Sequence, residues 1–186
     1  MLDGLSKIFK HLGRDVMIYM MPGLVVLLDL AYLDYLYDTQ VYVTIQAIPC
    51  SYSWIVFVGL LYIFGTISMA FAEVLYPKID KWEPYAGLLN DDIAVAKKDM
   101  GLYDQFVERY NTLSLYRYNL RYSFLLCAVL NVIFGLIYGL IYSFRDWLLV
   151  VLIITALLLI LFWIFRRLCC QTDCDYYDRV RKIAQQ

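Results

Sequence analysis

The sequence lacks the residue patterns on which most enzyme sites are built. Its only histidine is His11, and it contains no nucleophile elbow, no Walker loop, no HExxH zinc motif and no dinucleotide fingerprint. Its formal net charge is −1, so no basic excess indicates binding to DNA. We therefore expect no enzyme activity and no cofactor.

Charged residues are also scarce, and long apolar runs take their place. Only 18% of the 186 residues are charged while 62% are hydrophobic, a hydrophobic share well above that of soluble domains. A bilayer core of roughly 30 Å needs about 20 mostly apolar residues in a helix. The segments that reach this length are residues 16–35, 54–75, 122–144 and 147–165. The sequence therefore predicts an all-α integral membrane protein with four transmembrane helices.

The distribution of positive charge predicts the orientation of these helices. Fifteen of the sixteen lysines and arginines fall in residues 1–14, 76–121 and 166–186, and the exception is Arg145. Cytoplasmic flanks of membrane helices carry an excess of Lys and Arg. We therefore expect both termini to face the cytoplasm.

These assignments divide the chain into five parts. Residues 1–14 place their apolar side chains on one stripe, which predicts an amphipathic helix in the membrane interface or, alternatively, a helix packed on the cytosolic segment. We expect Gly13 to end this helix and Asp15 to cap the next one. The other parts are a first transmembrane hairpin (15–75, outer loop 37–53), a cytoplasmic helical segment (76–121), a second transmembrane hairpin (122–166) and a cytoplasmic tail (167–186).

The connecting segments carry further signals. The outer loop contains "QVYVTIQAI", whose alternation is typical of a short strand or hairpin. Residues 104–134 contain no proline or glycine, which predicts one helix over 104–144 that starts in the cytoplasm and continues into the membrane. Only residues 144–146 separate the last two apolar runs, so these two helices should be antiparallel neighbours.

The most informative polar residue is Asp29, which lies well inside the first apolar run. A charged side chain near the bilayer centre costs about 2.5 to 3.5 kcal/mol, so it usually faces a partner or a wet cavity. Asp29 could belong to a ring of acids around a polar path in an oligomer. Alternatively, it could be neutral and buried against Asn131, Thr66 or Ser68. The candidate pore or intramembrane polar residues are Asp29, Asn131, Asp34 and Glu73, the last two nearer the membrane boundaries.

Proline and glycine are few, and their positions predict bends and close contacts. Pro22 and Gly23 fall about two turns into the first apolar run, where proline removes a backbone donor. A bend is expected there, either purely structural or a gating hinge. Gly135 and Gly139 form a GxxxG pattern that favours close helix packing, within or between subunits. Glycines that could serve packing within the subunit are Gly59 and Gly65.

Arginines and cysteines gather near the predicted cytoplasmic boundary. Three arginines recur at spacings of eight and four, and they could bind an anionic ligand or RNA or mark the lipid headgroup level. Three cysteines follow the last apolar run in a CC-x3-C pattern, and three thiolates could bind zinc together with a fourth ligand. Because this is not a standard zinc spacing, no metal site is predicted, and acylation or a structural role are the alternatives. The arginines are Arg109, Arg117 and Arg121, and the cysteines are Cys169, Cys170 and Cys174.

Two segments carry a resemblance to a class of membrane proteins. They are "DVMIYMMPGLVVLL", with a Tyr-x-x-Pro-Gly entry into the first apolar run, and "LYRYNLRYSFLL", an arginine-bearing helix that continues into a later one. Together they resemble small multispan membrane proteins encoded beside bacterial antiviral systems, including accessory proteins of RNA-targeting CRISPR loci. Some of these carry an Arg-x4-6-His pair for RNA cleavage, but no arginine precedes His11, so ribonuclease activity is not expected.

The resemblance implies a location in a bacterial inner membrane and an oligomeric pore or a depolarising effector that stops growth during infection. Together with the buried acid and the bent helix, it predicts a homo-oligomeric membrane channel or membrane-perturbing effector. The alternative is a membrane-anchored regulatory subunit that binds a cytosolic protein or RNA through residues 76–121 and the tail. An enzyme acting on lipid is not favoured, because the acids lie at different depths.

Overall fold

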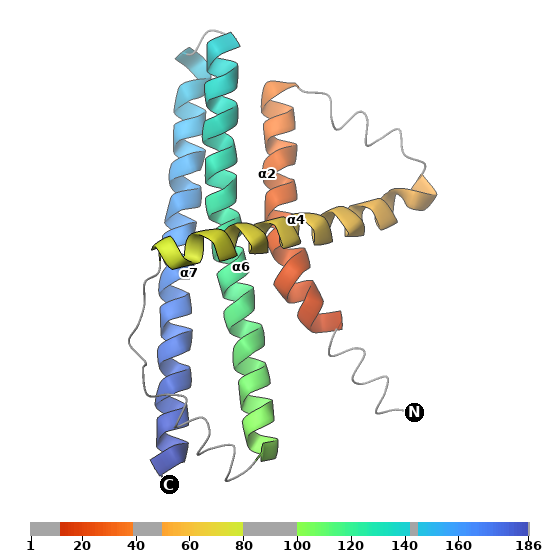
Figure 1. Ribbon diagram of the computed structural model, residues 1–186. Helices are drawn as coiled ribbons and strands as arrows, with labels where there is room; N and C mark the ends of the chain where they lie inside the picture. The colour runs from red at the N-terminus through yellow and green to blue at the C-terminus, as the bar shows by residue number, and fades with distance from the viewer. Residues whose placement is uncertain (1–11, 39–49, 80–99, 142–144, 186) are drawn as a thin grey trace.

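The computed structural model describes residues 12–38, 50–79, 100–141 and 145–185, and nearly all of these are helical. The elements are a π-helical segment η1 (Val16–Met20) followed by the helices α2 (Met21–Tyr37), α4 (Cys50–Ile79), α6 (Met100–Ile141) and α7 (Arg145–Gln185), shown in Figure 1. The predicted interfacial helix and the outer-loop strand lie almost entirely outside the described residues.

Four helical stretches are long and apolar enough to cross a membrane, which confirms the expected number. They are Leu12–Tyr37, Tyr52–Leu75, Thr112–Gly139 and Leu148–Val180. Each contains most or all of one predicted span. Their orientation, with both termini in the cytoplasm, stays a prediction.

The helices α6 and α7 form a long antiparallel hairpin. They contain 42 and 41 residues and lie side by side in Figure 1. At 1.5 Å per residue each is about 60 Å long, roughly twice the thickness of a bilayer core. The helix expected to begin near residue 104 begins at Met100. In residues 167–185, which were assigned from the sequence only as a tail, α7 continues as far as Gln185.

The helix α4 crosses the other helices instead of running beside them. Figure 1 shows α4 lying crosswise over α2 and α6. Its buried residues form one stripe with spacings of four, three and four: Leu61, Gly65, Ser68 and Ala72. Most of the remaining described side chains of α4 are exposed and apolar. The predicted first hairpin is therefore a crossing, in which α2 and α4 meet over a short stretch.

Candidate functional site

The first helix changes direction next to Pro22. Residues 12–15 are α-helical, residues 16–20 form the π-helical segment, and Pro22 lies in the first turn of α2. Figure 1 shows the helix bending near the point where α4 crosses it. The expected bend thus takes the form of a π segment, in which the Met21 N–H donates to the carbonyl of Val16. The predicted helix end at Gly13 and the cap by Asp15 are wrong, because the helix passes through both residues without a side-chain cap.

A buried asparagine compensates for the missing donor of Pro22. In an α-helix the N–H of residue 22 would bond to the carbonyl of Ile18, and proline has no N–H. The Asn119 Nδ2 group of α6 donates to that carbonyl at 2.9 Å, and the Asn119 side chain is fully buried. The backbone carbonyl of Asn119 in turn accepts a bond from Ser68 Oγ of α4 at 3.2 Å. Asn119 therefore joins the three helices where they cross.

Two glycines allow this crossing to be close. A Cβ added to Gly23 would overlap the Leu61 carbonyl oxygen, and a Cβ added to Gly65 would overlap the Tyr19 carbonyl oxygen. Each helix therefore presents a glycine to the backbone of the other. Gly59, in contrast, has nothing within 4 Å of an added Cβ. The role of Gly23 is close packing against α4, and Gly65 serves packing within the chain as expected.

The acid Asp29 is buried between α2 and α6. It is 8% exposed, and its Oδ1 atom accepts a hydrogen bond from Asn131 Nδ2 at 2.7 Å. The same Nδ2 group donates to the Cys127 carbonyl at 3.0 Å, which fixes the orientation of the amide. The Cys127 thiol lies 3.9 Å from the Val25 carbonyl. The structure thus places Asp29 against one of the three partners considered from the sequence.

Each residue of this pair keeps one buried oxygen atom without a hydrogen-bond partner among the described residues. Along α2, α6 and α7 such oxygen atoms include Asp29 Oδ2, Asn131 Oδ1, Tyr32 Oη, Tyr37 Oη and Thr155 Oγ1, and Asn119 Oδ1 at the helix crossing is another. A buried polar atom without a partner costs about 1 to 3 kcal/mol, so these oxygen atoms require an explanation. The ring of Tyr37 stacks on Tyr138 of α6 with 4.1 Å between the centroids, which extends the aromatic and polar interface toward the end of α2.

The other two acids do not take part in the Asp29–Asn131 hydrogen bond. Asp34 is half-buried on α2, and its backbone carbonyl accepts the N–H of Asp38. Glu73 is exposed on α4. Of the GxxxG pair, Gly135 packs within the chain, since an added Cβ would lie 3.0 Å from Val151 Cγ1, and Gly139 is half-buried on α6.

The three candidate arginines are not presented together on one surface. Arg109 is exposed. Arg117 donates to the Leu168 carbonyl at 3.2 Å and to the Thr172 hydroxyl, so it joins α6 to α7. Arg121 is 3% exposed and lies over the Tyr122 and Phe162 rings at 4.8 and 4.9 Å. Two of the three therefore hold the hairpin together from inside it.

The cysteines after the last apolar run are spread around α7. Cys169 is buried, while Cys170 and Cys174 are partly exposed. No group of three metal-ligating side chains occurs in the part of the chain that the structure describes. These cysteines therefore do not form a metal site by themselves.

Three of the residues at these junctions were missed from the sequence. Asn119 precedes the predicted third span, so it was not counted as a membrane residue. Tyr32 was not considered as a polar site residue. Thr155 offered a usable signal, because it is the only polar residue within 147–165.

Comparison with known proteins adds no further information about the site. No protein-family model, no curated protein and no solved structure matches the chain. The resemblance to membrane proteins of antiviral loci consequently depends on two short segments of the sequence, and the function has to be argued from the geometry.

Proposed function

We propose that the chain is a homo-oligomeric, cation-conducting membrane protein in which the Asp29–Asn131 pair controls passage. The observation that carries this proposal is an acid 8% exposed within apolar helices, with one carboxylate oxygen bonded and the other open. A packed structural pair would use both oxygens, because open polar atoms are costly in a membrane protein. A carboxylate oxygen without a hydrogen bond can bind a cation that passes through the protein.

The position of the pair favours a path within each subunit. Asp29 faces Asn131 of its own chain, so a ring of Asp29 carboxylates around a shared axis is the less favoured arrangement. A cation can pass the Asp29–Asn131 pair only if α2 moves relative to α6. The π segment next to Pro22 supports such movement, since π-bulges are frequent at functional sites and interrupt the regular hydrogen-bond ladder.

Assembly of several subunits is supported by the outer surface. Along α7, six large apolar side chains are at least half exposed: Leu149, Leu152, Ile153, Leu157, Ile160 and Trp163. Lipid covers such a surface, and neighbouring subunits can cover part of it. A role in antiviral defence follows from the resemblance alone, and it predicts that expression depolarises bacterial cells and stops their growth.

Ion flux through liposomes that contain the purified protein tests the proposal. We expect flux in the wild type and a loss of at least tenfold in Asp29→Asn, because the substitution removes the charge and keeps the shape. Asp34→Asn is the matched control, since it makes the same change on the same helix outside the pair, and its flux should equal that of the wild type. Equal flux in all three proteins would remove Asp29 from the mechanism.

A regulatory subunit is the second possibility, favoured by the shape of the α6–α7 hairpin. Between the first turns of α6 and the last turns of α7, Tyr110 donates to Asp173 Oδ1 at 2.7 Å and stacks on Tyr176 with 3.8 Å between centroids. These contacts support an ordered two-helix extension that could bind a cytosolic protein or RNA. Two results together would support this function instead. They are the absence of ion flux through the liposomes, and a cytosolic protein or RNA that co-purifies with the wild type but not with Arg109→Glu.

A further inference from the structure

Four of the open oxygen atoms come from three helices that pack in turn, α2 on α6 and α6 on α7. They are Asp29 Oδ2 and Tyr32 Oη of α2, Asn131 Oδ1 of α6 and Thr155 Oγ1 of α7. We propose that these four atoms form a binding site for a dehydrated monovalent cation the size of Na⁺. This inference rests on the proposed function, and the binding measurement below can fail independently of the flux measurement.

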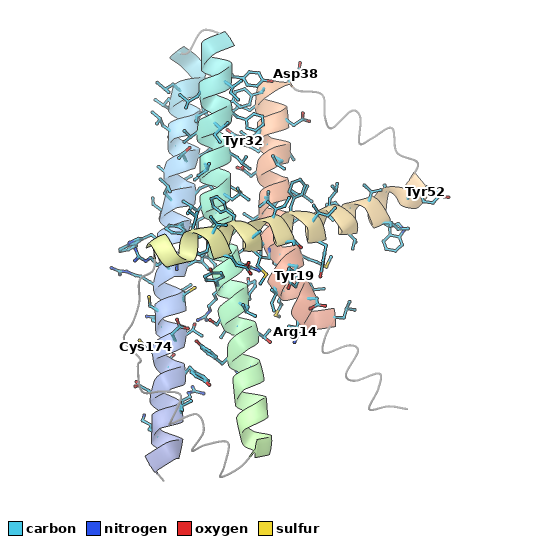
Figure 2. The ribbon with its side chains drawn as sticks, in the orientation of Figure 1. Arg14, Tyr19, Tyr32, Asp38, Tyr52 and Cys174 are labelled. Carbon is cyan, nitrogen blue, oxygen red and sulfur yellow. The ribbon has the colours of Figure 1, made fainter. Side chains whose placement is uncertain are left out.

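Contacts on α2 and α6 bring the first three atoms together. Asp29 and Asn131 are joined by the 2.7 Å hydrogen bond. Tyr32 lies three residues after Asp29, so the two side chains share a face of α2. Figure 2 shows Tyr32 on the side of α2 that faces α6.

The packing of α6 on α7 adds the hydroxyl of Thr155. A Cβ added to Gly135 would lie 3.0 Å from Val151 Cγ1, so these two residues mark one level of the hairpin. Because the helices are antiparallel, one turn back along α6 and one turn forward along α7 reach the same depth. Asn131 is one turn before Gly135, and Thr155 is one turn after Val151. Thr155 therefore faces α6 at the level of Asn131.

The chemistry of these atoms suits a cation better than a further donor. Asn131 donates both amide hydrogens, to Asp29 Oδ1 and to the Cys127 carbonyl. Its Oδ1 atom can only accept and remains available to a cation. The second carboxylate oxygen is also an acceptor, and the two hydroxyls can each offer a lone pair. Carboxylate, amide and hydroxyl oxygens are the ligands that hard cations prefer.

The charge of the site favours a monovalent ion. One ionised carboxylate and one monovalent cation sum to zero, whereas a divalent cation would leave an uncompensated charge in a medium where charges are costly. The buried Arg121 lies ten residues before Asn131 on α6, about 15 Å along the helix axis, which is too far to neutralise Asp29.

Binding of ²²Na⁺ to the purified protein in detergent tests the site, together with its thermal unfolding in NaCl and in N-methyl-D-glucamine chloride at equal ionic strength. We expect saturable ²²Na⁺ binding and a higher unfolding midpoint in NaCl. Thr155→Val removes one ligand without changing the side-chain shape, and it should weaken Na⁺ affinity by about tenfold or more. Thr66→Val is the matched control, because the Thr66 hydroxyl is exposed and bonds to the Tyr62 carbonyl of its own helix.

The outcomes separate the site from the proposed function. No saturable ²²Na⁺ binding, or equal affinity in Thr155→Val and Thr66→Val, would overturn the site. Stability that depends on pH and is the same in both salts would also overturn it and assign Asp29 to a proton instead. Ion flux without Na⁺ binding would support the channel and overturn the Na⁺ site. Na⁺ binding without ion flux through liposomes would support the Na⁺ site and overturn the channel.

Discussion

Asn119 and Ile18 are 101 residues apart in the chain, yet the Asn119 amide donates to the Ile18 carbonyl at 2.9 Å. The pairing exists because Pro22 cannot supply the α-helical donor to this carbonyl. It also places Asn119, which bonds to Ser68 of α4, at the centre of the crossing. A bend in one helix is thereby coupled to the position of two others.

This relationship predicts coupling between Pro22 and Asn119. Asn119→Leu removes the donor to a buried carbonyl and should lower the free energy of unfolding by about 1 to 3 kcal/mol. In a Pro22→Ala background the alanine N–H can replace that donor, so the same substitution should cost less. A double-mutant cycle from SDS-induced unfolding in mixed micelles measures the difference. Additive costs would show that Pro22 and Asn119 act independently.

The glycines of α4 should differ sharply in their tolerance of alanine. Gly65→Ala forces the backbones of α2 and α4 apart and should destabilise the protein by about 1 to 3 kcal/mol or more. Gly59→Ala meets open space and should be neutral or stabilising by up to about 1 kcal/mol, because alanine is the better helix former. Thermal unfolding midpoints in detergent compare the two variants. A similar midpoint for both would mean that the close crossing does not occur.

Two arginines of α6 should also differ in how much their replacement destabilises the protein. Arg117→Leu removes hydrogen bonds from a charged donor to α7 and should cost about 1.5 to 3 kcal/mol. Arg109→Leu changes an exposed side chain and should alter stability by less than about 0.5 kcal/mol. The unfolding of both variants in detergent gives the comparison, and an equal cost would contradict the role of Arg117 between the helices.

The crosswise position of α4 predicts the depth of its residues in a bilayer. If α6 and α7 cross the membrane along their length, α4 runs close to the membrane plane. Spin labels at the exposed positions Phe57 and Val74 should then report similar depths from their accessibility to oxygen and to a water-soluble nickel complex. Depths in opposite halves of the bilayer would show that α4 spans the membrane once the protein is inserted.

Some features of the polar site could be anticipated from the sequence. Asp29 stood out because an acid in an apolar run is costly, and Asn131 was among its three possible partners. The choice among Asn131, Thr66 and Ser68 could not be made, since it depends on how α2 lies relative to α4 and α6. Ser68 instead bonds to Asn119, and Thr66 bonds within its own helix.

The sequence by itself determined the helices. In an apolar environment each backbone N–H and C=O must find a partner close by in the chain, so composition and length alone predicted four apolar helices and the continuous α6. The tertiary structure alone decided which side chains meet. The bonds from Asn119 to Ile18 and from Asn131 to Asp29 join residues 101 and 102 positions apart, and such pairs depend on helix crossings. Those crossings are decided by steric fit between whole surfaces, here by Gly23 and Gly65, and local periodicity carries no information about that fit.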